Sequence, residues 1–147
     1  MRVSVIGGGR IGSDVAETAA AVGKLLGQRG HTVVCGGLGG VMEAACRGAK
    51  EAGGKTIGVL PGENPAEANE YVDVAVATGL GHARNALVVM NGDAVVAIDG
   101  SGGTLSEVGF SFVYEKPIAG LETHDGEGVE AGATPEEAVT YVESASK

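Results

Sequence analysis

The chain has 147 residues, a formal net charge of −9 and 44% hydrophobic residues. This length fits a single domain covering residues 1–147, and the hydrophobic content argues against disorder. The acidic balance and the 3% aromatic content argue against a nucleic-acid partner, which needs basic surface or stacking side chains. No apolar run approaches the ~18–20 residues of a membrane-spanning helix, and the N-terminus shows no signal-peptide pattern. We therefore expect a cytoplasmic protein with no membrane partner.

Glycine and charge are the unusual features of the composition. The chain has 27 glycines, more than twice the usual share of ~7%, without a collagen-like period. It has 19 acidic against 10 basic residues, so self-repulsion predicts halophile-like stabilisation by molar KCl. Two cysteines, Cys35 and Cys46, are too few for a disulfide framework or a metal site, and we expect buried, reduced thiols.

Short apolar strands alternate with helices along the chain. In chain order we predict strand Arg2–Ile6, glycine loop Gly7–Gly12, a helix from Ser13 to about Leu26, strand His31–Cys35, glycine loop Gly36–Gly40, helix Val41–Ala52, strand Lys55–Leu60, polar loop Pro61–Asn69, strand Tyr71–Val76, a helix over about His82–Met90, strand Ala94–Ile98, glycine loop Asp99–Thr104, helix Leu105–Tyr114, strand Pro117–Leu121, an exposed acidic loop Glu122–Thr134 and helix Pro135–Ala145. Ser13 and Thr134 are expected to cap their helices, and Leu105, Val108 and Phe112 to face inward.

This order predicts an α/β fold, a single doubly wound Rossmann-like domain with a mostly parallel sheet and helices on both faces. Each glycine loop follows a strand and precedes a helix. Ligands of such sheets bind at the carboxyl edge, near the switch in strand order. Three glycine loops at that edge let the backbone approach a ligand closely, which accounts for the glycine excess.

The first loop has the spacing Gly7-x-Gly9-x-x-Gly12 of a dinucleotide-binding fingerprint. An NAD site also needs Asp or Glu at the end of the second strand, where this chain has Cys35-Gly36-Gly37. NAD(P) binding is therefore disfavoured. A tight turn without a ligand and general phosphate or nucleotide binding both remain open.

The third loop has two interpretations. Its small residues expose N–H groups at a helix N-terminus, which favours a bound anion. By spacing alone, Thr104 and Glu107 also fit a capping box, in which Glu107 reaches back to the Thr104 N–H. The alternative places Glu107 beside a bound phosphoribosyl group. No Lys follows the glycines, so this is not a P-loop.

Two basic residues precede the fifth strand. Arg84 follows a strand's carboxyl end, and arginine grips phosphate through two N–H donors; a solvated surface arginine is the alternative. His82 fits a loop or capping role better than an acid–base role.

In combination these segments resemble the LOG family, which includes cytokinin-activating phosphoribohydrolases and molybdenum cofactor carrier proteins. The resemblance is carried by Cys35–Met42 (CGGLGGVM), Gly58–Pro61 (GVLP), Ala83–Asn85 (ARN) and Gly100–Glu107 (GSGGTLSE), and covers about residues 2–145. It implies a homodimer or higher homo-oligomer and a phosphorylated small-molecule ligand, a nucleoside monophosphate or a pterin. The chain departs from the enzymes' pattern at Asp99, at Ser101 and at Asn85, where Lys is usual. The Arg84-Asn85 pair is more similar to the carrier branch.

The resemblance and the glycine loops together give the expected site. The family's catalytic Arg and Glu correspond to Arg84 and Glu107. The expected ligand-binding residues are Gly8, Gly9 and Arg10 in the first loop, Gly36, Gly37, Gly39, Gly40 and Met42 in the second, and Gly100, Ser101, Gly102, Gly103 and Thr104 in the third.

Two functions of different classes follow. As an enzyme, the protein would hydrolyse the N-glycosidic bond of a nucleoside 5′-monophosphate, with Arg84 orienting the substrate. Glu107 would stabilise the oxocarbenium-like charge or activate water. As a carrier, the same site would hold the molybdenum cofactor as cargo, and neither role requires a resident cofactor. A third function, DprA-like nucleic-acid binding on a related fold, is disfavoured by the charge.

Overall fold

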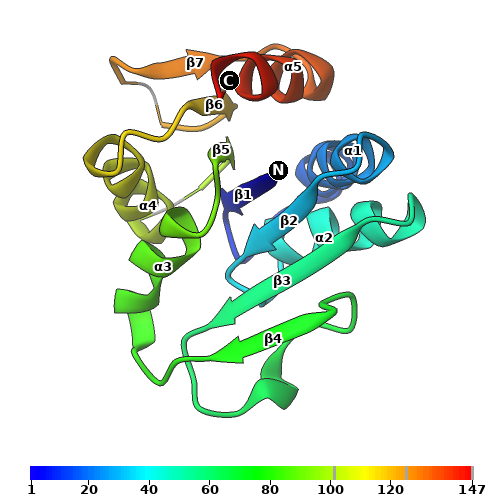
Figure 1. Ribbon diagram of the computed structural model, residues 1–147, viewed down its shortest axis with the longest axis vertical. Coiled ribbons are helices and arrows are strands. Elements are labelled where there is room, and N and C mark those ends of the chain that lie inside the picture. Colours follow the sequence, from blue (N-terminus) through cyan, green and yellow to red (C-terminus); the bar gives the residue numbers. More distant parts are fainter. Residues whose placement is uncertain (101, 125, 147) are drawn as a thin grey trace.

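The computed structural model describes residues 1–100, 102–124 and 126–146. In this part of the chain seven strands form one sheet, and every pair of neighbouring strands is parallel. The strands are β1 (Arg2–Gly7), β2 (Thr32–Cys35), β3 (Lys55–Leu60), β4 (Val74–Ala77), β5 (Ala94–Ile98), β6 (Ile118–Leu121) and β7 (Val129–Ala131). Their order is β4-β3-β2-β1-β5-β6-β7, so the order reverses between β1 and β5 (Figure 1). The predicted α/β fold with a parallel sheet is confirmed.

Helices cover both faces of the sheet (Figure 1). One layer holds α1 (Ser13–Gln28), α2 (Val41–Glu51) and α5 (Pro135–Ala145), and the other holds α3 (Asn85–Met90) and α4 (Gly102–Val113). Two 3-10 turns, η1 (Pro65–Glu67) and η2 (Gly81–Arg84), lie in the connections before β4 and α3. None of the helices in the described ranges is long and apolar enough to cross a membrane.

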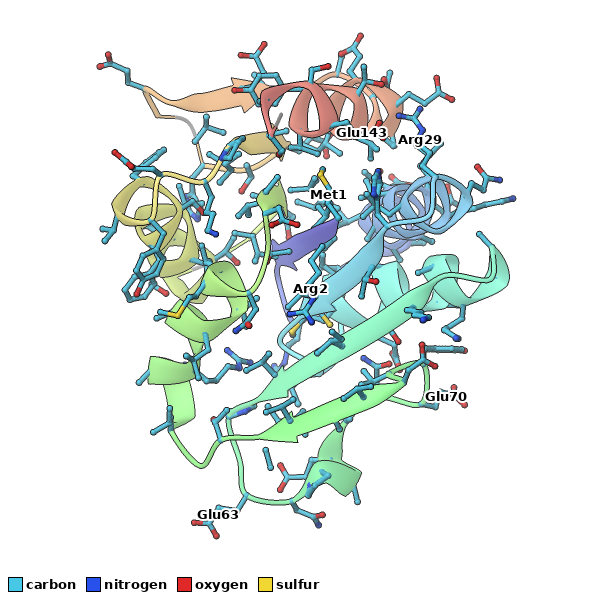
Figure 2. The ribbon with its side chains drawn as sticks, in the orientation of Figure 1. Met1, Arg2, Arg29, Glu63, Glu70 and Glu143 are labelled. Atoms are coloured by element: carbon cyan, nitrogen blue, oxygen red, sulfur yellow. The ribbon has the colours of Figure 1, made fainter. Side chains whose placement is uncertain are left out.

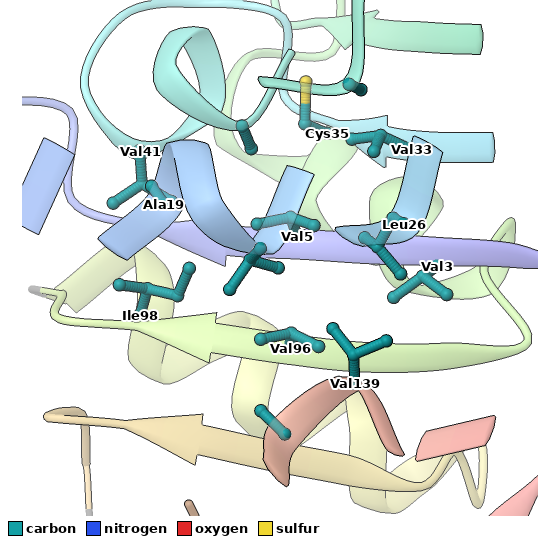
Figure 3. Close-up of a cluster of buried hydrophobic side chains, with 14 of the residues drawn as sticks. Val3, Val5, Ala19, Leu26, Val33, Cys35, Val41, Val96, Ile98 and Val139 are labelled. Carbon is teal, nitrogen blue, oxygen red and sulfur yellow. The ribbon is translucent and has the colours of Figure 1, made fainter. Parts of the chain in front are cut away.

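The larger core lies between the sheet and the layer of α1, α2 and α5. Figure 3 shows Val3 and Val5 of β1 beside Val96 and Ile98 of β5, with Leu26 of α1 among them. All five residues of β5 are buried, which explains why this strand reads as a continuous apolar run. A smaller core on the other face includes Ile6, Val88 and Val108.

Two glycines bring α1 and α2 together. A Cβ on Gly23 would lie 1.9 Å from the Ala45 carbonyl oxygen, and one on Gly48 would lie 2.0 Å from the Ala20 carbonyl oxygen. The helices therefore touch backbone to backbone, which only glycine permits. Helix packing therefore explains part of the glycine excess, whereas the sequence pattern predicted that the extra glycines lie in loops at the carboxyl edge of the sheet.

The C-terminal helix α5 contacts the residues at the C-terminal end of α1. Glu143 of α5 pairs with Arg29 at 2.5 Å and with His31 at 2.8 Å, and Figure 2 shows Arg29 beside Glu143. At the other end of α5, Thr134 caps the helix as predicted, because its hydroxyl accepts the Glu137 N–H at 3.2 Å. The Glu137 carboxylate accepts the Ala133 N–H at 2.8 Å.

Several local predictions are wrong. The acidic loop contains the edge strand β7, which pairs with β6. β4 begins at Val74, because Tyr71 is held by a turn in which its N–H donates to the Asn69 side chain. Leu105 and Phe112 are exposed, and only Val108 of that predicted inward face is buried. Ser13 does not cap α1, whose N-cap is Gly12 without a side-chain hydrogen bond.

Candidate functional site

A cavity of about 180 Å³ opens at the switch point between β1 and β5. It is lined by the end of β1, the first two glycine loops, η2 and the first turns of α4. The lining residues are Val5, Ile6, Gly7, Gly9, Gly36, Met42, His82, Arg84, Asn85, Gly103, Thr104 and Glu107. Four buried polar side chains, Arg84, Asn85, Thr104 and Glu107, therefore gather at the carboxyl edge, where such sheets bind ligands.

Arg84 is a buried cation on this cavity, with 8% of its surface exposed. Its Nη1 donates to the Asn85 side-chain oxygen, and its Nη2 donates to the Gly36 carbonyl at 3.5 Å. Its Nε is buried without a hydrogen-bond partner, the one such side-chain atom in the described residues. Burial lowers the pKa of Arg84, and Glu107 opposes that shift. The guanidinium is therefore desolvated and incompletely satisfied.

Asn85 continues this contact toward α4. It is 3% exposed, and its amide donates to the Ser106 hydroxyl at 3.1 Å. Ser106 in turn donates to the Gly103 carbonyl at 2.6 Å. The Arg84 side chain is thereby connected through side-chain contacts to the first turn of α4, which lines the other side of the cavity.

Glu107 is the buried acid of the site. It lies on α4, one turn after Thr104, and 8% of its surface is exposed. Burial raises the pKa of Glu107 to about 7, although the nearby Arg84 lowers it. A carboxyl group with this pKa exchanges its proton near neutral pH, as an acid–base group needs to.

The capping-box interpretation of Thr104 and Glu107 is wrong. Helix α4 begins at Gly102, two residues before Thr104, so Thr104 belongs to the first turn and is not the N-cap. Thr104 is also buried and lines the cavity. Both residues therefore line the cavity, and the interpretation that places Glu107 beside a ligand stays a prediction.

The two cysteines are buried next to this site, Cys35 at the end of β2 just before the second glycine loop and Cys46 on α2. Their Sγ atoms are 3.5 Å apart, both residues are free and fully buried, and the Gly37 N–H donates to the Cys35 sulfur at 3.3 Å. The contact with Cys46 lowers the pKa of Cys35 most, with smaller contributions from Gly37 and Arg84 that act against burial. The prediction that both thiols are buried is confirmed.

A second cavity of about 430 Å³ adjoins the first at Gly9. Arg10, Gly40 and Arg47 line it, together with Glu43 in the first turn of α2. Because Arg10 is exposed and lies here, the structure does not bring it to the cavity of Arg84.

The cavity collects part of the predicted ligand-binding set. Gly9, Gly36, Met42, Gly103 and Thr104 line it together with Arg84 and Glu107. Among the described residues, those that do not line it are Gly8, Arg10, Gly37, Gly39, Gly40, Gly100 and Gly102. Ser101 lies outside the described residues. Gly40 has φ +67° and sits against Gly8, so its role is in the turn.

Sequence reasoning missed three kinds of lining residue. Val5 and Ile6 belong to a strand and carried no motif. His82 was assigned to a loop or cap, yet it lines the cavity from η2. Asn85 carries part of the family resemblance in the sequence, but its contact role was not predicted: it bridges Arg84 and α4. The adjacency of Asn85 to Arg84 was the available signal.

In the residues that the structure describes, no group of three or more His, Cys, Asp or Glu side chains is placed to hold a metal ion. The polar donors on the cavity are the Arg84 side chain and the backbone of the first turn of α4, groups of the kind that bind anions.

Comparisons with known proteins show which family and which solved structures this chain is similar to. The model of the SLOG cluster4 family matches residues 1–147. A protein of Archaeoglobus fulgidus described as uncharacterized is 40% identical over 147 residues, covering 99% of this chain and 97% of that protein. Among solved structures, the molybdenum cofactor binding protein of the phototrophic bacterium Rippkaea orientalis is 33% identical, with a TM-score of 0.93 and coverage of 99% and 97%. The molybdenum cofactor carrier protein of Chlamydomonas reinhardtii is 32% identical, with a TM-score of 0.87 and coverage of 97% and 96%.

These matches extend over nearly the whole of each chain and confirm both the Rossmann-like fold and the resemblance to the carrier branch. On the strength of the family match and the 40% identical relative, this chain belongs to the SLOG cluster4 family.

Proposed function

We propose that this protein binds a phosphorylated pterin, the molybdenum cofactor, as cargo at the carboxyl edge of its sheet. The observation that carries the proposal is Arg84, a buried cation on the cavity whose Nε–H has no partner. An unpaired buried donor costs free energy that an anionic ligand would recover. The molybdenum cofactor binding and carrier proteins among its structural relatives support the pterin.

The phosphate of this ligand would be held between Arg84 and α4. Gly103 and Thr104 lie in the first turn of α4, where backbone N–H groups have no partner within the helix and the helix dipole is positive. Both residues line the same cavity as Arg84. Because the whole chain carries a net charge of −9, these local groups must supply the attraction for an anion.

The remaining lining suits the ring of the ligand. Ile6, Gly36 and Met42 give the cavity an apolar wall, and a Cβ on Gly36 would lie 2.7 Å from the Met42 sulfur. Glycine at this position therefore keeps room beside Met42 and Arg84. In this role the cofactor is cargo, and no residue of the chain transforms it.

A loading experiment tests the proposal. The purified protein is mixed with molybdenum cofactor released from a molybdoenzyme and is then separated from free ligand by gel filtration. We expect pterin fluorescence, measured after oxidation, to elute with the protein. Arg84→Met should abolish this coelution, whereas Arg47→Met in the neighbouring cavity should retain it. Equal loading of both variants would reject the site.

A second function, hydrolysis of a nucleoside 5′-monophosphate, is favoured by one observation. Glu107 has a pKa raised to about 7 by burial and lies near a cation, so it can be either a carboxylate or an acid at neutral pH. As a carboxylate it would stabilise positive charge developing at C1′ or activate water, and Arg84 would orient the substrate.

Incubation with AMP distinguishes catalysis from binding. Hydrolysis would release adenine and ribose 5-phosphate, and Glu107→Gln should reduce the rate by ~10²–10⁴-fold, the range for a lost acid–base group. If AMP remains intact after long incubation while pterin loading succeeds, the protein is a carrier and not this enzyme.

We also propose that two copies associate through α3 and α4. Met90, Leu105, Phe112 and Val113 expose apolar surface there, and Glu107 is the only charged residue of either helix and is buried. In a chain of net charge −9, this is a face on which a second copy meets no like charge. Light scattering should show a dimer or larger assembly, and Phe112→Glu should reduce it to a monomer.

The proposed partner class excludes nucleic acid, supported by the net charge of −9. The proposed compartment is the reducing cytoplasm, supported by Cys35 and Cys46, which remain free thiols although their sulfur atoms are 3.5 Å apart. Alkylation of the unfolded protein after anaerobic purification should label both.

A further inference from the structure

The side chain that follows Arg84 links the two walls of the cavity. Asn85 accepts from Arg84 with its oxygen and donates to Ser106 with its amide nitrogen. Ser106 donates to the carbonyl of Gly103, in the first turn of α4. The Asn85 side chain thus uses both of its polar ends, one on each wall, and it is 3% exposed.

The contacts of Arg84 show why such a link matters. A buried guanidinium is drawn toward solvent because burial disfavours its charge, and its pKa is lowered accordingly. Two acceptors oppose this, the Asn85 oxygen and the more distant Gly36 carbonyl at 3.5 Å. The Asn85 contact is therefore the principal hydrogen bond that keeps the guanidinium at the cavity.

We propose that Asn85 is a positioning residue that fixes the Arg84 guanidinium relative to the first turn of α4, acting through Ser106. The cavity then presents its cation and its helix N-terminus at a set separation, as recognition of a single phosphate group requires. The binding consequence rests on the proposed function, whereas the positioning of Arg84 does not.

The choice of asparagine follows from its donors and acceptors. A lysine at this position would carry only donors, so it could not accept from Arg84, and it would place a second cation beside the first. An amide accepts from Arg84 and donates to Ser106 without carrying a charge. The neutral side chain also adds no second cation beside Arg84, whose charge lowers the pKa of the Glu107 carboxyl.

The pKa of Glu107 depends on the position of Arg84 and can be measured without a ligand. The charged or titratable groups around it are Arg84 from η2, which lowers its pKa, and Cys35 from β2, which interacts with both Arg84 and Glu107. His82 lines the same cavity from η2. If Arg84 moves away, its attraction weakens and the pKa of Glu107 rises further.

The ligand-free test is a carbon-13 NMR titration of the Glu107 carboxyl group in the full chain. Asn85→Ala should move the midpoint to higher pH, and Ser106→Ala should move it in the same direction by less. Asn91→Ala is the matched control, because Asn91 ends the same helix and its amide contacts only the Leu87 carbonyl at 2.8 Å. Ser106 and Asn91 are exposed, so their variants should fold.

The binding test is calorimetry with AMP as the phosphate-bearing probe. Asn85→Ala should weaken the Kd about tenfold, the scale of one hydrogen bond to a charged group. The double variant with Ser106→Ala should bind no more weakly than Asn85→Ala alone, because both changes break one connection.

The outcomes separate the two proposals. If the Glu107 midpoint is the same in Asn85→Ala as in the parent, the positioning role is overturned. Additive effects of Asn85→Ala and Ser106→Ala would also overturn it. If the parent binds neither AMP nor the pterin while the midpoint still moves, the positioning of Arg84 stands and the proposed function fails.

Discussion

The two helical layers of this molecule are built differently. In the layer of α1, α2 and α5, helices touch backbone to backbone at Gly23 and Gly48, and the buried side chains are almost all apolar. In the layer of α3 and α4, Arg84, Asn85 and Glu107 are buried beside the sheet edge, and apolar side chains of α4 face outward.

Under the proposed function, this difference separates the tightly packed layer from the layer that supplies the buried charged side chains of the site. Close packing of apolar surface stabilises the first layer and leaves little room for chemistry. Buried charges cost free energy unless they are paired, so we expect Arg84 and Glu107 to make the second layer less stable in exchange for the proposed anion site. The following changes test this division, beginning with the largest expected effect.

Alanine at a packing glycine should damage only the first layer. In Gly48→Ala the new Cβ would meet the Ala20 carbonyl oxygen at 2.0 Å, so the helices must separate. We expect a loss of about 3 kcal/mol in the free energy of unfolding, the upper scale for overpacking. Urea denaturation measures it.

The matched control is Gly109→Ala on α4, where a Cβ would meet nothing within 4 Å. This change should stabilise the protein by up to ~1 kcal/mol, since alanine favours a helix. Equal effects at the two glycines would contradict the division between the layers.

Removing the buried acid should change how stability depends on pH. The pKa of Glu107 is raised from 4.5 to about 7, so the folded state holds its proton more tightly than the unfolded chain does. Its stability contribution is complete below pH 4.5 and is lost as pH rises through about 7. Between pH 5 and pH 8, the parent should lose about 2–3 kcal/mol more than Glu107→Gln. Parallel pH profiles from urea denaturation would show that Glu107 titrates normally.

The features that the sequence predicted correctly are local. β5 is a continuous apolar run between turn residues, and α2 combines a buried stripe of Val41, Ala45 and Ala49 with Gly53-Gly54 at its end. Such patterns need no knowledge of neighbours. Arg84 and Glu107 were singled out by their places after strand ends and by the family resemblance, and the fold brings them to one cavity.

The features that the sequence could not predict depend on contacts far along the chain. β7 lies within an acidic, glycine-rich segment, and its pairing with β6 makes it a strand. Leu105 and Phe112 share a helical spacing with buried Val108, but spacing does not say which face meets the sheet. The bridge from Asn85 to Ser106 joins residues 21 positions apart.

The acidic surface should respond to salt as a whole. With 19 acidic and 10 basic residues, screening of self-repulsion should raise the melting temperature in molar KCl. A melting temperature that is unchanged between low and molar KCl would show that charge repulsion does not limit the stability of this protein.

The smallest expected effect is at the junction of α1 and α5. Hydrogen bonding from His31, with Arg29, lowers the pKa of Glu143, so its contribution is present above its unfolded pKa and is lost as pH falls through the lower folded value. Because these side chains are about one-third exposed, Glu143→Gln should cost no more than ~1 kcal/mol at pH 7. The cost should vanish in acid, and urea denaturation at the two pH values checks this.

The central claim is that the α3–α4 layer recognises a phosphate group through Arg84. The most direct measurement is the Kd of a phosphorylated pterin and of the same pterin after phosphatase treatment, for the parent and for Arg84→Met. We expect the parent to prefer the phosphorylated form by about tenfold or more, as one charged contact implies, and Arg84→Met to lose this preference. Equal affinity of the parent for both forms, or a preference that survives in Arg84→Met, would contradict it.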